Sequence, residues 1–274
     1  MTSPALAARP DVSVEPSAIL RFAEDCWTIT EGELRKLVHD PTELLTRAVQ
    51  PVLWLIVFGE VLAGVRAIPT GSLGYLDFLA PGVLAQSALF SAIFFGIAVI
   101  WERDLGVLHK YLVSPASRAA LVSGKALAGG LRALTQAAVV YVVAALVGVD
   151  LKIGIAEVLG VMLVVVLGAA GFATFSLIIA CLVRTRERFM GIGQILTMPL
   201  FFASSAIYPV AVMPTWLQVV AHLNPLTYQV DALRALMVQG GVATFPIPLD
   251  IAILAGTVVI LVAVGSRLYP RLAE

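Results

Sequence analysis

Residues 101–125, WERDLGVLHKYLVSPASRAALVSGK, bring six charged side chains, a histidine and a proline together between long apolar stretches. The Gly124-Lys125 pair would suit the end of a phosphate-binding loop, which needs the pattern G-x-x-x-x-G-K-[ST]. Ala119 stands where the first glycine is required, and Ala126 stands where the hydroxyl is required. This loop therefore cannot bind ATP, and we expect no catalytic residue on the chain.

The spacing of the leucines in this run predicts a short amphipathic helix. Leu105, Leu108 and Leu112 recur at i, i+3 and i+7, whereas Arg103 and Lys110 lie off that line. Such a helix can dock apolar anchors into a groove on a soluble partner, within a charged rim. An ordinary solvated loop that carries positive charge is the other interpretation, and composition does not separate the two.

A second helix is predicted to begin at the end of the same run. Ser114 suits an N-cap and Pro115 suits the first helical position, so the chain would turn there and enter the next apolar stretch. The run thus predicts a short helix, a corner and a helix start.

The whole composition indicates a membrane protein. Of 274 residues, 59% are hydrophobic and 13% charged, against about 25% charged in soluble domains, and the mean hydropathy is +0.95. The net charge is zero, which gives no bulk attraction to nucleic acid, and Cys26 and Cys181 fit two isolated structural thiols. We expect an all-α fold with six spans of about 20 residues, at residues 46–64, 79–100, 126–148, 156–183, 191–208 and 249–266.

Basic residues predict the orientation of these spans. Six spans place both termini on one side, and 14 basic residues fall on that side: Arg9, Arg21, Arg35, Lys36, Arg47, Arg103, Lys110, Arg118, Lys125, Arg184, Arg186, Arg188, Arg267 and Arg271. Three fall opposite: Arg66, Lys152 and Arg234. Because cytoplasmic loops carry the excess of Lys and Arg, both termini are expected in the cytoplasm and the spans in the plasma (inner) membrane.

The segment before the first span is predicted to be an amphipathic helix. Apolar side chains recur between residues 19 and 38 among charged ones, so one face would lie at the headgroup boundary. A cytosolic helix packed on the protein's own loops is the alternative. We divide the chain into a cytosolic tail with this helix, residues 1–45, and a six-span domain, residues 46–270.

Residues 221–241 predict a short helix on the outer side. Asn224 can cap it, Pro225 fits its first position, and Asp231 and Arg234 stand three residues apart. Gly240-Gly241 is expected to end it. Leu226, Val230, Leu233 and Met237 form its apolar stripe. We expect this helix, with the proline-containing segment before it, to close the outer face rather than to bind a ligand.

Few polar side chains fall within the spans. Because such groups are costly in hydrocarbon, they should face protein or water. They are Gln86, Ser87, Arg132, Gln136, Gln194 and Thr197. Arg132 is expected to reach the cytosolic interface, and the lack of an ionisable residue at any span centre disfavours a proton relay.

These features together resemble the membrane subunit of a type-2 ABC exporter, close to the daunorubicin-resistance-like permeases. The resemblance covers residues 30–266 and follows the amphipathic helix, DPTELLTRAVQPVLWLIVFG, the 101–125 run and NPLTYQVDALRALM. The most specific matches are Glu102, Arg103, Gly106, Pro115, Arg118, Gly124 and Lys125 in the run, and Asn224, Pro225, Asp231, Arg234 and Ala235 near the end.

The resemblance implies a division of labour. Six spans would form half a transporter, two identical or related halves would pair, and each half would bind a cytosolic ATP-binding-cassette subunit that carries ATP and Mg. Residues 101–125 would couple the chain to that subunit, through Glu102, Arg103, Leu105, Gly106, Leu108, Lys110, Leu112, Pro115 and Arg118. The path would run between the halves along the first, second and fifth spans, and Gln86, Ser87, Gln194 and Thr197 are candidates to line it.

The cargo class follows only in outline. An apolar path suits drug-like or lipid-like compounds moved out of the cytoplasm with energy from the partner. Export of a lipid-linked polysaccharide is the second interpretation, and a self-sufficient channel or scaffold in the bilayer is the third.

Overall fold

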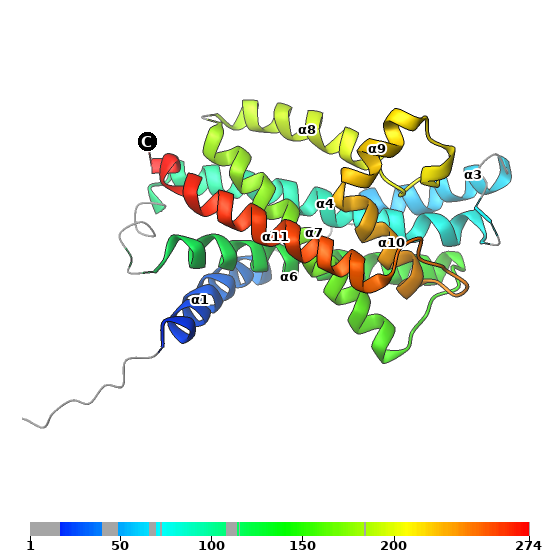
Figure 1. Cartoon of the computed structure of the whole chain (residues 1–274), viewed down its shortest axis with the longest axis horizontal. Coiled ribbons are helices and arrows are strands. Elements are labelled where there is room, and N and C mark those ends of the chain that lie inside the picture. The colour runs from blue at the N-terminus through cyan, green and yellow to red at the C-terminus, as the bar shows by residue number, and fades with distance from the viewer. Residues whose placement is uncertain are drawn as a thin grey trace, which may run out of the picture.

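The computed structural model describes residues 17–39, 49–65, 70–71, 73–107, 114, 116–183 and 185–273, and the regular elements in these ranges are helices (Figure 1). Four of the helices are long and apolar enough to cross a membrane by length and composition. These are α4 (Tyr75–Asp104), α6 (Arg118–Val147), α7 (Ile155–Leu182) and α11 (Ile247–Leu268), which η3 (Tyr269–Ala273) extends. The chain is thus a multi-pass membrane protein whose described regular elements are all helical.

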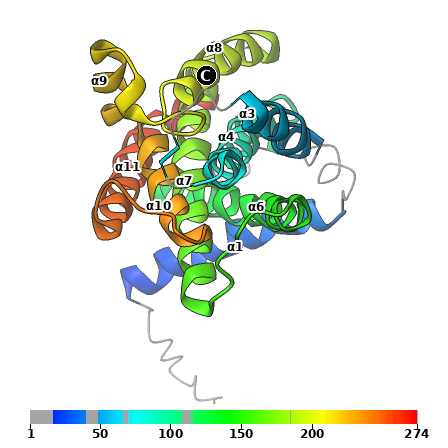
Figure 2. The same cartoon turned by 90° about the vertical axis from the view of Figure 1, so that its right-hand side faces the viewer.

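Helix α7 forms the centre of the bundle, with α4, α6, α10 and α11 packed around it (Figure 2). Its middle consists of small residues, Gly168 to Gly171, which are all buried. Small side chains let neighbouring backbones approach closely, which is how helices gain packing contact where lipid is the solvent. Gly168 shows this directly, because a Cβ there would overlap the amide of Gln229 on α10.

Two of the six expected spans differ in detail from the prediction: the start of the first lies outside the described residues, and the fifth is shifted towards the N-terminus. The first comprises residues 49–53, a π-helical turn η1 (Trp54–Phe58) and α3 (Gly59–Val65). The fifth is α8 (Arg186–Phe202), whose 17 residues extend about 25 Å against a hydrocarbon core of about 30 Å. At its end, Asn224 Nδ2 donates to the carbonyl oxygens of Leu200, at 2.6 Å, and Ala203, at 3.0 Å, which satisfies two carbonyl groups of the helix terminus.

Shorter helices occupy the two ends of the bundle. Helix α1 (Ala18–His39) lies beside α6 at the end that also holds the C-terminus, on the left of Figure 1. At the opposite end lie η2 (Val210–Val212), α9 (Thr215–Leu223) and α10 (Pro225–Met237). The pair α9 and α10 confirms the short helices expected between the fifth and sixth apolar segments.

Candidate functional site

Four charged side chains meet where α4 ends, and we call them the four-charge cluster: Glu33, Lys36, Glu102 and Lys125. Lys125 Nζ on α6 lies 2.8 Å from Glu33 Oε1 on α1 and 2.6 Å from Glu102 Oε2 on α4. Lys36 Nζ bonds the same two carboxylates, at 3.2 Å and 2.6 Å. Two positive and two negative charges thus join three helices that are distant in sequence.

Burial separates the two lysines of the cluster. The side chain of Lys125 is 1% exposed and that of Lys36 is 50% exposed. Burial acts to raise the pKa of the Glu33 carboxyl, but the ammonium groups of Lys125 and Lys36 outweigh it and lower that pKa to about 2. The carboxylate of Glu33 is therefore held ionised between α1 and α6.

Helix α1 reaches the cluster because α6 offers it a surface of small residues. A Cβ on Gly124 would lie 2.8 Å from the Cys26 carbonyl oxygen, so only glycine allows this approach. Thr30 Oγ1 donates to the Gly124 carbonyl oxygen at 3.1 Å, and Ile29 is buried in the contact. This face of α1 thus packs on helix α6 rather than on loops, while Trp27 on the other face is 56% exposed.

A second network fixes the opposite side of the α4 terminus. Asp104 Oδ2 lies 2.7 Å from Arg186 Nη2 at the start of α8, and the Arg186 guanidinium stacks 3.7 Å from the Trp101 ring centroid. Arg103 Nη1 donates to the Val183 carbonyl oxygen at 3.3 Å. The last turn of α4 is therefore tied to α1 and α6 on one side and to α7 and α8 on the other.

The chain leaves α4 sharply after these contacts. Leu105 caps the helix and is 71% exposed, and Gly106 adopts φ +72°, a left-handed conformation that glycine adopts most readily. The predicted amphipathic helix therefore does not continue α4. Four predicted coupling residues lie outside the described residues: Leu108, Lys110, Leu112 and Pro115.

The helix after the loop begins three residues later than the sequence predicts. Ser117, not Ser114, is the N-cap of α6, since its Oγ accepts from Ala120 N at 3.1 Å. Ser114 Oγ instead accepts from Ala116 N at 3.4 Å in the preceding turn. The sequence offers two capping hydroxyls three residues apart, and the structure uses the second. Arg118 is then the first residue of α6 and is exposed.

The expected outer helix begins as predicted. Asn224 Oδ1 accepts from Leu226 N at 3.0 Å, and Pro225 is the first residue of α10. The four residues of its apolar stripe are fully buried. The helix ends at Met237, before Gly240-Gly241, because Val238 turns into an isolated β-bridge with Leu151.

Asp231 and Arg234 bind separate partners. Asp231 Oδ2 accepts from the backbone nitrogens of Thr244, at 2.7 Å, and Phe245, at 2.9 Å, which secures the turn before α11. Arg234 Nη2 donates to the Ser205 carbonyl oxygen at 2.7 Å, and its guanidinium lies 3.9 Å from the centroid of the Phe78 ring. Both side chains therefore hold together the end of the bundle that contains α9 and α10.

The four candidate path residues differ in burial and in their contacts. Gln86 is buried on α4, while Gln194 is exposed on α8. Thr197 is buried and donates its hydroxyl to the Gly193 carbonyl oxygen within its own helix. Ser87 lines a cavity that also contains Gln136. Arg132, one turn from Gln136, lies with its guanidinium 5.9 Å from the Phe95 ring centroid.

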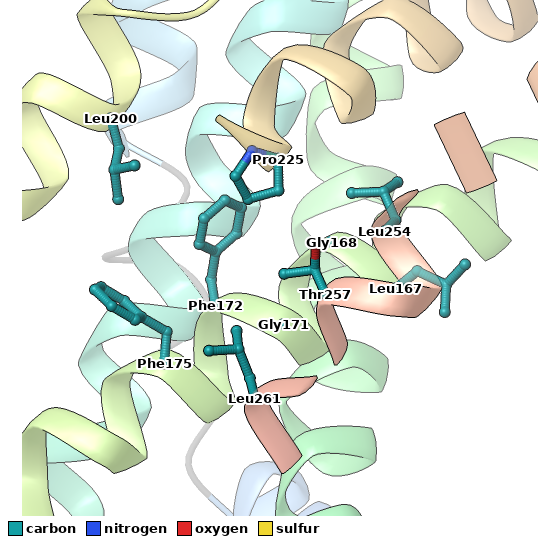
Figure 3. Close-up of a pocket in the computed structure, with 10 residues that line it drawn as sticks. All are labelled: Leu167, Gly168, Gly171, Phe172, Phe175, Leu200, Pro225, Leu254, Thr257 and Leu261. Carbon is teal, nitrogen blue, oxygen red and sulfur yellow. The ribbon is translucent and has the colours of Figure 1, made fainter. Parts of the chain in front are cut away.

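An apolar cavity of about 210 Å³ lies between α7, α8, α10 and α11. Figure 3 shows the Phe172 ring directly beneath Pro225, with the α11 residues Leu254, Thr257 and Leu261 on the right. The lining residues are Leu167, Gly168, Gly171, Phe172, Phe175, Leu200, Pro225, Leu254, Thr257 and Leu261. The Thr257 hydroxyl donates to Ile253 O at 2.8 Å, so the walls suit apolar groups.

Sequence reasoning missed three members of the four-charge cluster as site residues: Glu33, Lys36 and Lys125. The charged side chains of α1 were expected on the face that contacts water, yet the side chain of Glu33 is only 4% exposed. A signal was present, because Lys125 opens a long apolar stretch and a lysine there requires a carboxylate partner.

Known proteins give a consistent comparison. A family model described as "ABC-2 type transporter" matches residues 24–238. A protein of Cyanophora paradoxa named as transport permease ycf38 is 29% identical over 78% of this chain and 74% of its own. The daunorubicin resistance ABC transporter permease protein DrrB1 of Streptomyces coeruleorubidus is 26% identical over 84% and 81%. Nodulation protein J of Rhizobium leguminosarum bv. viciae is 26% identical over 83% and 86%.

Proposed function

Because the chain belongs to the ABC-2 type transporter family, as a non-catalytic permease subunit, we propose that it exports hydrophobic or amphipathic compounds from the cytoplasm. A separate cytosolic ATP-binding-cassette subunit would bind ATP and Mg and supply the energy. Two permease chains, identical or related, would pair around the path. Each would lie in the plasma membrane with both termini in the cytoplasm.

The observation that carries this proposal is the anchoring of the α4 terminus. Residues 101–107 are the first part of the predicted coupling segment, residues 101–125. Within them, Glu102 forms ion pairs with Lys36 of α1 and Lys125 of α6, and Asp104 forms an ion pair with Arg186 of α8. A push on the run from a partner subunit would therefore reach several helices together. An isolated flexible loop could not transmit such a movement.

The cargo class rests on the cavities and on the relatives. None of the described residues that line the cavity in Figure 3 is charged, which suits an apolar cargo or an acyl chain. One relative is named for daunorubicin resistance, which favours drug-like cargo, and another is named for nodulation. Export of a lipid-linked polysaccharide is the second candidate, and the family match disfavours a self-sufficient channel or scaffold.

Purification with an ATP-binding-cassette subunit tests the assembly. We expect a complex with two permease and two ATP-binding chains, and ATP hydrolysis that rises with transported compounds in proteoliposomes. The permease alone should hydrolyse no ATP. A stable monomer that transports without a partner would contradict the proposal.

The coupling run can be tested in the same complex. Interface anchors cost about 1–4 kcal/mol on truncation, and exposed charges about 0–1. Leu108→Ala combined with Leu112→Ala should therefore weaken partner binding or transport far more than Lys110→Ala. If these leucines instead pack on the permease itself, the double variant will also lose thermal stability. Full partner binding and transport would identify the run as a solvated loop.

A further inference from the structure

A second cavity, also of about 210 Å³, lies between the first apolar segment, α4 and α6. Gln50, Ser87 and Gln136 give it polar groups that the cavity in Figure 3 lacks, and Phe90 and Phe94 give it aromatic walls. Phe94 is 44% exposed, so this wall reaches the surface of the helix bundle. The cavity is thus open to molecules dissolved in its surroundings.

The polar groups of this cavity include one buried acceptor that is left unpaired among the described residues, although the cavity is also lined by side chains that can donate, such as Gln50 and Ser91. Gln136 is 2% exposed, and its Oε1 has no hydrogen-bond partner within the part of the chain that the structure describes. A buried acceptor left unpaired costs about 1–3 kcal/mol. Ser87 donates its hydroxyl hydrogen to the Leu84 carbonyl oxygen at 2.9 Å, so towards a ligand its oxygen can only accept a hydrogen bond.

Size and charge narrow the ligand further. Among the described residues, those that line the cavity carry no charged side chain, so they offer an ion no counter-charge. Drug-sized ligands occupy about 300–1,000 Å³, so this cavity takes a compact ring or one end of a larger molecule. Aromatic walls favour a flat ring, since offset stacking and edge-to-face contacts stabilise ring pairs.

We propose that this cavity binds neutral aromatic alcohols, or the aromatic hydroxyl end of a larger cargo, with Gln136 Oε1 accepting the hydroxyl hydrogen. This inference rests on the proposed export function and names a substrate class for it. It assigns to α6, through Gln136, a contact with the cargo that the expected path along the first, second and fifth spans does not include.

Equilibrium dialysis of the full chain in lipid nanodiscs tests the proposal without ATP or a partner subunit. The probes are 1-naphthol and 1-methoxynaphthalene, which differ in the hydroxyl hydrogen, and binding to empty nanodiscs is subtracted. We expect saturable binding, with 1-naphthol about 5–10-fold tighter, as one hydrogen bond to a buried acceptor allows.

Three variants identify the group responsible. Gln136→Leu should lower 1-naphthol affinity to that of the ether and leave the ether unchanged. Gln239→Leu makes the same change at an exposed residue outside the cavity and should alter neither. Ser87→Leu adds volume inside the cavity and should abolish binding of both probes, which decides the matter if Gln136→Leu does not fold.

The outcomes separate this inference from the proposed function. The inference is overturned if the two probes bind with equal affinity, or if Gln136→Leu has no effect. It is also overturned if binding is no greater than in empty nanodiscs, in which case the cavity holds only water. Transport with a partner subunit could still proceed in those cases. Conversely, if the chain binds 1-naphthol selectively but never transports, the export proposal is wrong and the binding site stands.

Discussion

Lys125→Met should destabilise the protein far more than Lys36→Met, although both lysines bind the same two carboxylates. Lys125 is 1% exposed, so its loss leaves Glu33 and Glu102 buried with one half-exposed cation between them. Removing one partner of a buried ion pair costs about 3–5 kcal/mol. Lys36 is 50% exposed, and pairs at such sites contribute about 0–1 kcal/mol. Methionine keeps the length and the helix propensity of lysine, which confines the comparison to charge.

The free energy of unfolding can be measured by titrating sodium dodecyl sulfate into detergent micelles and following tryptophan fluorescence. A third protein combines Lys125→Met with Glu33→Gln and Glu102→Gln. It should recover much of the loss, because no buried carboxylate is left without a counter-charge. If Lys125→Met and Lys36→Met differ by less than about 1 kcal/mol, the burial argument is wrong. If the triple variant is no more stable than Lys125→Met, the deficit comes from packing and not from unpaired charge.

Gly124→Ala should speed amide hydrogen exchange in α1, because its Cβ would lie 2.8 Å from a backbone oxygen of that helix. Gly256→Ala is the control and should leave this exchange unchanged, because a Cβ there meets nothing within 4 Å outside its own helix. In a chain without native cysteines, His109→Cys should react with an impermeant maleimide only from the cytosol and Thr244→Cys only from outside, and reversed labelling would refute the orientation. The pKa of Glu33 is lowered from 4.5 to about 2, so its stabilisation is complete above pH 4.5 and lost as the pH falls towards 2. The melting temperature of the unaltered protein should therefore fall more between pH 6 and pH 3 than that of Glu33→Gln, and equal falls would contradict this.

Local signals predicted the local structure well. Asn224-Pro225 fixed the start of α10, because an Asx cap followed by proline determines backbone geometry within a few residues. The apolar stripe of α10 was also confirmed, since a 3.6-residue period is visible in any single sequence. The long apolar stretches predicted α4, α6, α7 and α11 for the same reason.

Long-range contacts could not be predicted in this way. A single sequence does not show that Glu33 forms an ion pair with Lys125. The pattern of charges alone cannot distinguish a solvent-exposed helix face from a face packed on another helix. The role of Gly124 likewise depends on the helix that crosses it. Asp231 and Arg234 were three residues apart as for a helical pair, yet each bound a different loop.

The ion pair between Lys125 and Glu33 has a consequence for biogenesis, because 92 positions separate the two residues. At about 5–20 residues per second, a ribosome needs roughly 5–20 s to pass from one to the other. During that interval the N-terminal helix has emerged but its cationic partner has not yet been synthesised. The carboxylate of Glu33 must therefore wait in water or at the headgroups, and α1 can dock only after α6 has entered the bilayer. Seating of the first helix thus follows the synthesis of α6 and cannot be the first step in membrane insertion.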